Sequence, residues 1–569
     1  MDIRRLLMGL VCVVASSFPA LYLSASQPVA KAGLTCGSPH IIGVYSEYSP
    51  HHSVRPAIAF NGKYYMVAWV DTETLQLHVR LSYKNGEPAS AVLTPSDLVS
   101  YPYSTPALLW DGTHFNLAWS AKPNASDMYY QICYMQLDGN GSKTLPEKQI
   151  SYVGLAPNGN IYHPVIAFNN TVMAVAYEGG PLTDTMFTPD IFVTLLNKSG
   201  EIAGNGALHD IGFDNISYID NQPSIAWSWT ENKFYLVWRG MDYQAYGSMI
   251  FYGTLTSDGV PSTPDVLASA IQDITRPTVT SSSSGLFFTF LQQTDTGLQL
   301  KARPGVTGYD MTLSTAPVTD APAAVISTSA EYEIFFAQQD PSTTTHNFYL
   351  KRIDASGVPV SGPTQLTGFD DAFACSAAMG YKNFMVAAGG DTTYGNTYGD
   401  LTFTIGCNTT DGPPGCPAVT YLSHVTGGQA TMTWAPASTP YNDLAYYKVY
   451  QDAAPVDRTV GNSYTFTGLS EGVSHNFVVV ALNAASWTST GCAEDYATVV
   501  TDGTFRLDLA KGAGGVVMNW SDGGTASYNV FRGTDPRALS PIASTADLTY
   551  TDPAATGSIV YYYSVDAAP

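Results

Sequence analysis

The chain has 569 residues, and its 47 acidic residues outnumber its 25 Lys and Arg residues, which gives a formal net charge of −22. This balance argues against a nucleic-acid partner, because phosphate backbones are bound by clustered Lys and Arg. Charged residues make up only 13% of the chain, whereas Tyr, Gly and Pro occur 37, 50 and 35 times. Such a composition favours strands and turns over helices, and the length exceeds that of one ordinary domain.

The N-terminus has the pattern of a secretory signal peptide over residues 1–32. Arg4 and Arg5 precede an uncharged apolar run from Leu6 to Leu23, and small residues follow it. Pro19 within the run, with no basic segment directly after it, disfavours the alternative of a membrane anchor. We therefore expect a secreted protein, extracellular or at the cell surface, with no membrane span after signal removal.

An internal repeat dominates residues 36–407. Seven stretches share a short apolar run, a turn such as Asn61-Gly62 and a second, aromatic-rich run, and their starts lie 45 to 59 residues apart. The starts are Pro56, Pro106, Pro164, Pro223, Pro277, Pro322 and Cys375. Two further strand-like segments follow in each unit, so each unit predicts a four-stranded sheet. Together they indicate a seven-bladed β-propeller, in which the aromatic residue that ends each second strand packs between blades.

The repeat resembles that of secreted bacterial propeller proteins with the pattern P-x-φ-A-φ-x-G-x-x-φ-φ-φ-x-W-x-D. The accompanying D-x-x-G-x-P segment of that group is present at Asp354–Pro359. The resemblance covers residues 36–407 and implies the fold alone, because propellers host many unrelated functions. The Ser-x-Asp-x-Gly-x-Thr-Trp box of sialidases does not occur in the sequence.

A change of pattern follows the Gly- and Pro-rich linker 408–415. Residues 416–503 resemble a fibronectin type III module, and residues 504–569 resemble a second, incomplete one. The segments that carry the first resemblance are Thr431–Trp434, Tyr447–Tyr450 and Phe477–Asn483. His475 stands where that family has its corner tyrosine, which puts the corner hydrogen bond in doubt. The resemblance implies an all-β chain: the propeller, one complete β-sandwich and one incomplete β-sandwich.

Six cysteines remain after removal of the signal peptide, an even number that suits an oxidising compartment. The segment before the first repeat is expected to complete the last sheet of the ring, where a disulfide would close it. A second disulfide is expected to join the two ends of the first sandwich module. The expected pairs are Cys36–Cys407 and Cys416–Cys492. The sequence leaves the partners of Cys133 and Cys375 open.

No catalytic motif with specific spacing occurs in the sequence, so we assign no catalytic residue. Propeller topology nevertheless brings the loop after each second strand and the loop before the next first strand to one face. Acidic residues recur in the first loop, and cationic residues precede several of the repeat prolines in the second. The candidate ligand-binding residues are Arg55, His163, Arg276, Asp71, Asp242 and Asp340. A polar ligand or calcium would suit them, and the alternative is that the acids only cap turn backbone.

These features lead us to expect a non-catalytic extracellular binding or adhesion protein, with the propeller presenting ligand-binding loops and the sandwiches acting as spacers. The expected partner is a polysaccharide or a cell-surface protein. One alternative is a secreted carbohydrate-active enzyme, a glycoside hydrolase or lyase, because fibronectin modules accompany many such enzymes. Another is a surface or filament subunit that self-assembles by strand exchange.

Overall fold

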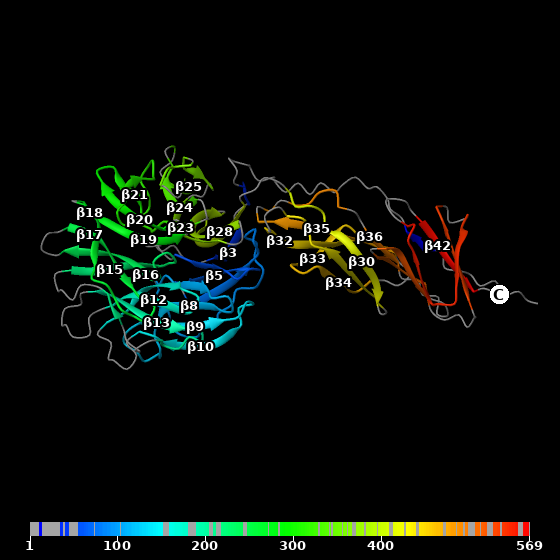
Figure 1. Cartoon of the computed structure of the whole chain (residues 1–569), viewed down its shortest axis with the longest axis horizontal. Coiled ribbons are helices and arrows are strands. Elements are labelled where there is room, and N and C mark those ends of the chain that lie inside the picture. The colour runs from blue at the N-terminus through cyan, green and yellow to red at the C-terminus, as the bar shows by residue number, and fades with distance from the viewer. Residues whose placement is uncertain are drawn as a thin grey trace, which may run out of the picture. The chain divides into compact units, whose positions relative to one another are not determined.

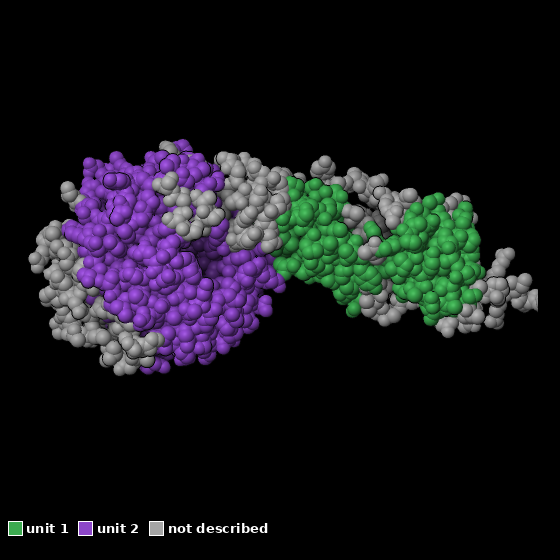
Figure 2. Space-filling model, viewed as in Figure 1, with its two compact units in different colours: residues 1–35, 408–569 green, residues 36–407 purple. Residues whose placement is uncertain are grey.

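The computed structural model describes residues 11–13, 35–37, 40–44 and 55–567, apart from positions 73, 103, 152–158, 180–188, 204–208, 212–217, 243–246, 271, 283–284, 328–330, 341, 343–344, 355–356, 361, 367–370, 380–382, 395–396, 409–412, 426–427, 440–442, 470–473, 485, 487, 493–494, 499–506, 513, 521–526, 535–537 and 556–560. These residues form strands and turns and no helix, so the chain is all-β where the structure describes it. Two compact units are present: residues 36–407, and residues 1–35 with 408–569 (Figures 1 and 2). None of the described segments is a helix long and apolar enough to cross a membrane.

The unit 36–407 consists of antiparallel sheets that follow one another along the chain. The first three sheets contain β4 (Ala57–Phe60), β5 (Tyr65–Val70) and β6 (Leu77–Ser82); β7 (Ala107–Trp110), β8 (Phe115–Ala121), β9 (Gln131–Leu137) and β10 (Lys143–Gln149); and β11 (Tyr162–Phe168), β12 (Val172–Gly179), β13 (Asp190–Asn197) and β14 (His209–Asp210). The next three contain β15 (Tyr218–Ser228), β16 (Lys233–Asp242), β17 (Gly247–Leu255) and β18 (Asp265–Ala270); β19 (Ile274–Ser282), β20 (Gly285–Thr294), β21 (Gly297–Pro304) and β22 (Met311–Thr312); and β23 (Ala324–Ser327), β24 (Glu331–Gln339), β25 (His346–Asp354) and β26 (Thr364–Gln365).

The last sheet combines both ends of this unit. It contains β27 (Asp371–Met379), β28 (Asn383–Tyr394) and β29 (Thr397–Asn408), together with β2 (Thr35–Cys36) and β3 (His40–Val44). Both N-terminal strands pair with β29, and the Cys36–Cys407 disulfide expected from the sequence joins the two ends. The segment before the first repeat therefore completes the sheet that is built from the last repeat.

The first strands of the sheets form a closed ring. Each first strand contacts the first strand of the next sheet, in the order β4, β7, β11, β15, β19, β23 and β27. The last of them, β27, contacts β4 and so closes the ring. This is the radial arrangement of a β-propeller (Figure 1). In each sheet the first strand lies innermost, so its starting residue belongs to the centre of one face of the ring. We call this face, where first strands begin and second strands end, the entry face.

In the first three sheets, the tight hairpin between the first and second strands is held by a polar side chain. Asp111 Oδ1 accepts hydrogen bonds from the backbone N–H groups of Thr113 and His114, both at 2.7 Å. Asn61 and Asn169 form the same turn in the first and third sheets. Gly112 follows Asp111 with φ of +96°, a conformation that favours glycine. These turns explain why the sequence pattern places a short polar pair between the two apolar runs.

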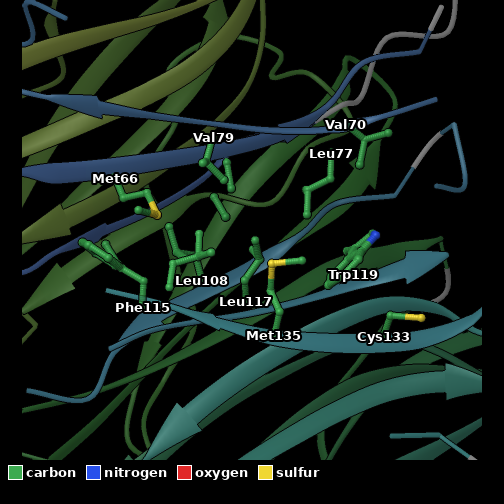
Figure 3. Packing of buried hydrophobic residues seen from close by; sticks show 14 of the residues in the cluster. Met66, Val70, Leu77, Val79, Leu108, Phe115, Leu117, Trp119, Cys133 and Met135 are labelled. Carbon is green, nitrogen blue, oxygen red and sulfur yellow. The ribbon is translucent and has the colours of Figure 1, made fainter. Parts of the chain in front are cut away.

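The core lies between neighbouring sheets. Met66 and Val79 of the first sheet pack against Leu117, Trp119 and other residues of the second (Figure 3). The aromatic residues that end the second strands are at most 4% exposed: Trp69, Trp119, Tyr177, Trp238, Phe290 and Phe336. Their role is therefore packing, as the sequence pattern predicts.

The other unit contains two sandwich-like halves that share one six-stranded sheet. This sheet has the order β34 (Ser463–Phe466), β31 (Gln429–Ala435), β30 (Ala418–Val425), β37 (Leu507–Gly512), β38 (Gly515–Trp520) and β41 (Thr549–Asp552), with β30 paired to β37. The first half adds a sheet of β33 (Ala454–Thr459), β32 (Leu444–Gln451), β35 (Ser474–Asn483) and β36 (Asp495–Thr498), and the second half adds a sheet of β1 (Val11–Val13), β42 (Tyr561–Ala567), β39 (Tyr528–Gly533) and β40 (Ser540–Thr545). Each sandwich has a core of aliphatic and aromatic side chains that includes one buried Trp, Trp434 in the first and Trp520 in the second. Their assignment as fibronectin type III modules stays a prediction.

Two sequence-based expectations concern the first sandwich: a disulfide between its ends and the role of His475. The Cys416–Cys492 disulfide expected from the sequence is present. His475, at the position of the corner tyrosine, has its Nδ1 2.7 Å from Asp452 Oδ2. Burial of Asp452 opposes its ionisation, but the hydrogen bonds and charge from His475 and the N–H of Asn476 outweigh this and lower the pKa of the carboxyl.

Candidate functional site

Three neighbouring sheets begin with the same backbone irregularity at the entry face. The register of β11, β15 and β19 shifts at the residue before the repeat proline, as in a β-bulge. His163, Gln222 and Arg276 occupy these positions with φ of 49°, 56° and 52°. Left-handed backbone is uncommon for residues other than glycine and clusters at functional sites. The same irregularity in three sheets therefore indicates that His163, Gln222 and Arg276 are candidate site residues.

The first of these residues forms an ion pair with a carboxylate of the next strand. His163 Nδ1 lies 2.7 Å from Glu178 Oε1, and Tyr162 is the cross-strand partner of Glu178. The other carboxylate oxygen, Glu178 Oε2, accepts a hydrogen bond at 2.9 Å from the backbone N–H of Gln222 in the following sheet. Glu178 is 8% exposed, so its charge is satisfied almost entirely by protein groups.

The hydrogen bonds continue across the next two sheets. Gln222 Oε1 accepts a bond of 2.8 Å from the backbone N–H of Arg276. The Arg276 guanidinium in turn binds both carboxylate oxygens of Asp320 at 3.1 Å. A continuous chain of polar contacts thus runs from His163 to Asp320 along the entry face.

Arg55 belongs to the same group of residues. Its Nε donates to the backbone carbonyl of Cys375 at 2.9 Å, which ties the first sheet to the last. Burial lowers the pKa of Arg55; the Cys375 thiol opposes this and the charge of Arg276 adds to it. The two arginines are therefore near enough to repel each other. We call these six residues the entry cluster: Arg55, His163, Glu178, Gln222, Arg276 and Asp320.

The electrostatics of the cluster favour the charged forms of the His163–Glu178 pair. Burial alone lowers the pKa of His163, but the charge and hydrogen bond of Glu178 outweigh it and raise the pKa. Burial alone raises the pKa of Glu178, but His163, the N–H of Gln222 and Arg276 together lower it. Each partner of the pair thus favours the charged form of the other.

Three partly buried tyrosines lie next to this pair. The ring of Tyr101 is 4.6 Å from that of Tyr162 and 5.2 Å from that of Tyr130, measured between centroids, and the Tyr162 and His163 centroids are 6.1 Å apart. Burial, with Tyr101 as the next cause, raises the pKa of Tyr162 to about 12, so its hydroxyl stays protonated. We call these three residues the tyrosine cluster.

Backbone contacts from different loops fix the tyrosine cluster. The N–H of Tyr101 donates to the carbonyl of Ser120 at 2.9 Å. The N–H of Tyr130 donates to the Asn160 side chain at 2.9 Å. Hydrogen bonds between loops therefore hold the backbone frame that presents the Tyr101 and Tyr130 rings.

The structure separates the residues that the sequence singled out. Arg55, His163 and Arg276 come together in the entry cluster. Asp71 Oδ1 accepts the N–H of Thr74 at 3.1 Å, and Asp340 Oδ1 accepts the N–H and the hydroxyl of Ser342 at 2.8 and 2.6 Å. These bonds are those of turn caps, and a ligand-binding role of both acids stays a prediction. Asp242 ends β16, and its side chain lies outside the described residues.

Sequence reasoning gave no special weight to Glu178, Gln222, Asp320 or the tyrosine cluster. Gln222 shares the pre-proline position of His163, which is a signal that could have found it. Glu178 lies at the end of β12 and Asp71 directly follows β5, and the sequence does not distinguish these two acids. In the part of the chain that is described, no group of three or more His, Cys, Asp or Glu residues could hold a metal ion.

Comparison with known proteins gives one informative sequence match. No family model matches the chain. Exoglucanase B of Cellulomonas fimi is 31% identical to it over 171 residues, which are 27% of this chain. The chain thus covers only 15% of that relative's length.

Solved structures with a similar course of the chain are distant. The WD40 domain of Toxoplasma gondii coronin has a TM-score of 0.37 at 10% identity and covers 66% of this chain and 89% of its own. A sialidase of Trypanosoma rangeli has a TM-score of 0.36 at 9% identity, and the match covers 84% of this chain and 92% of the sialidase. An endo-arabinase of Bacteroides thetaiotaomicron has a TM-score of 0.30 at 13% identity, and the match covers 48% of this chain and 99% of the arabinase. Scores this low carry no argument about function.

The sequence match requires a correction. The expectation of a non-catalytic binding or adhesion protein is wrong in the light of the similarity to exoglucanase B, whose name is that of an enzyme. The sequence gives no contiguous motif for a pair such as His163–Glu178, because a bulge and a cross-strand contact assemble it.

Proposed function

We propose that the protein is a secreted carbohydrate-active enzyme that cleaves glycosidic bonds at the entry cluster. In this proposal the unit 36–407 is a seven-bladed propeller and the other unit supplies fibronectin type III modules. The observation that carries the proposal is the 31% identity over 171 residues to exoglucanase B. Because that match covers a small part of the relative, the substrate and reaction of this chain are inferred from its own residues.

The His163–Glu178 pair supplies the acid–base chemistry of the proposal. Nδ1 of His163 is engaged by Glu178, so Nε2 is the atom left to exchange a proton with a ligand. In hydrolysis, Nε2 donates its proton to the leaving glycosidic oxygen as the bond from that oxygen to the anomeric carbon breaks. Water adds to the anomeric carbon, and its proton returns to Nε2. The ionised Glu178 stabilises the imidazolium and the positive charge that develops on the sugar.

The tyrosine cluster supports a carbohydrate as the ligand. Tyrosine rings present an apolar face with a polar hydroxyl at the edge, which matches a sugar ring with its apolar faces and its rim of hydroxyls. Because Tyr162 directly precedes His163, a sugar bound on these rings lies beside the acid–base pair. The hydrogen-bonded backbone frame around Tyr101 and Tyr130 limits the entropy lost on binding.

The proposal is tested by incubating the purified full chain with a panel of neutral and acidic polysaccharides and measuring released reducing ends. We expect cleavage of at least one polysaccharide and its loss in a His163→Gln variant. His114→Gln is the matched control, because His114 lies in the β7–β8 hairpin, away from the entry face. The proposal fails if no polysaccharide is cleaved, or if His163→Gln cleaves as fast as the wild-type chain.

A further inference from the structure

We propose that the entry cluster binds a carboxylate-bearing sugar, so that the substrate is a polysaccharide containing uronic acid units. This inference rests on the function proposed above and deepens it, because it names the substrate class. The charges of the cluster differ from those of the chain as a whole.

The entry cluster contains three cations and two anions. The cations are Arg55, His163 and Arg276, and the anions are Glu178 and Asp320. Glu178 is used by His163 and by the N–H of Gln222, and Asp320 is used by both donors of Arg276. The cluster therefore has one uncompensated positive charge, on a chain whose formal net charge is −22.

Arg55 is the residue that has this uncompensated charge. It is partly buried and forms no ion pair with any residue that the structure describes, and its one hydrogen bond, from Nε, goes to the carbonyl of Cys375. Arg276 lies near enough to repel it. A partly desolvated cation beside a second cation is costly unless an anion binds there. The remaining guanidinium donors of Arg55 are thus available for a ligand.

The chemistry of the donors selects the anion. A guanidinium offers parallel N–H groups that match the two oxygens of a carboxylate, and such charge-assisted pairs are short and strong. The tyrosine cluster beside His163 selects a ring with apolar faces. Tyr101 lies in the connection between the first sheet, which Arg55 begins, and β7 of the second. A carboxylate on a sugar ring satisfies both features, whereas a neutral sugar leaves Arg55 unpaired.

The test is calorimetric binding of trigalacturonate, cellotriose and a sulfated galactan trisaccharide to the full chain. We expect trigalacturonate to bind at least about tenfold more tightly than cellotriose, with an affinity that falls as salt increases. An Arg55→Gln variant should lose about tenfold or more of this preference. The matched control is Arg303→Gln, because Arg303 is also partly buried but is paired with Asp310 away from the entry face.

Each outcome decides between readings. Equal affinity for trigalacturonate and cellotriose, or an unchanged preference in Arg55→Gln, overturns the inference; tighter binding of the sulfated sugar overturns the carboxylate assignment. If Arg55→Gln does not fold, Arg55→Lys keeps the charge without the planar donors and should still weaken trigalacturonate binding. Cleavage of neutral polysaccharides alone would leave the proposed function standing and refute this inference. No binding and no cleavage of any carbohydrate would refute both.

Discussion

Glu178 and His163 meet at 2.7 Å only because the backbone of β11 bulges at His163. In a regular antiparallel pair, neighbouring residues of one strand point to opposite faces, so Tyr162 alone would lie beside Glu178. The positive φ of His163 turns its imidazole to the same carboxylate. The consequence is a buried acid–base pair at the centre of the entry face.

The stability contributed by this pair should depend on pH with two limits. The folded pKa of His163 is raised, so its contribution is complete below the unfolded pKa near 6.5 and is lost as pH rises through the folded value. The folded pKa of Glu178 is lowered, so its contribution is complete above the unfolded pKa near 4.5 and is lost as pH falls through the folded value.

This expectation is checked by melting curves of the wild-type chain and a His163→Gln variant. The curves are recorded between the two unfolded pKa values, near 4.5 and 6.5, and at pH values below and above them. The difference in melting temperature should be largest between the two unfolded pKa values and should shrink on both sides. A difference that does not change with pH would mean that packing, and not charge, accounts for the stability of the pair.

Closure of the ring by Cys36–Cys407 should stabilise the unit 36–407. The bond links residues 371 positions apart, and loops this long restrict the unfolded chain most. In the chain-entropy model the effect is about 6 kcal/mol at most, less any strain in the native state. Denaturant titration should therefore show a lower unfolding free energy for Cys36→Ser/Cys407→Ser than for the wild-type chain. Added reductant should lower the stability of the wild-type propeller unit to that of the variant; equal stability without reductant would count against the role of the bond.

Trp238 should affect stability and not ligand binding directly. It is fully buried between the third and fourth sheets, in contact with residues such as Phe251. Truncation of a large core aromatic costs about 3–5 kcal/mol. We expect Trp238→Ala to melt early while the folded fraction still binds carbohydrate, in contrast to Arg55→Gln. Early loss of binding at temperatures where Trp238→Ala remains folded would place this residue in the site.

Asp552 should be a stability determinant of the second sandwich. It is 3% exposed and accepts hydrogen bonds from Arg532 Nη1 at 2.8 and 2.9 Å and from the Tyr563 hydroxyl at 2.9 Å. Removal of one partner leaves a poorly solvated charge, which costs about 3 kcal/mol. Asp552→Ala should therefore lower the unfolding free energy far more than Asp547→Ala, whose carboxylate is bonded to Thr545 near the surface. Similar losses in both variants would contradict the buried-charge argument.

Much of the fold follows from local sequence signals, and much of the site does not. The spacing of Pro56, Pro106 and their equivalents predicts the first strands because proline is accepted at the start of a strand. The pre-proline position likewise selects Arg55, His163 and Arg276. The sequence alone gives no preference for Glu178 over Asp71, because each lies where a second strand ends and only the bulge at His163 makes Glu178 part of a pair.

The tyrosine cluster was beyond sequence reasoning for a similar reason. Tyr101, Tyr130 and Tyr162 come from three connections, and their contact depends on backbone hydrogen bonds such as that between Tyr101 and Ser120. Tyrosine is abundant throughout the chain, so no single ring stands out by composition. Contacts between loops of different sheets are set by the closure of the ring, which has no signature within any one repeat.

The most direct test of the account is the cleavage rate of Glu178→Gln on the polysaccharide that the wild-type chain cleaves fastest. Gln keeps the size and one acceptor oxygen but removes the charge that raises the pKa of His163. We expect at least about a hundredfold lower rate, the usual contribution of positioned acid–base groups, with an unchanged fold by circular dichroism. Glu201→Gln, which alters an exposed carboxylate paired with Lys148, should keep the wild-type rate. A Glu178→Gln rate equal to that of the wild-type chain would contradict the assignment of the reaction to the entry cluster.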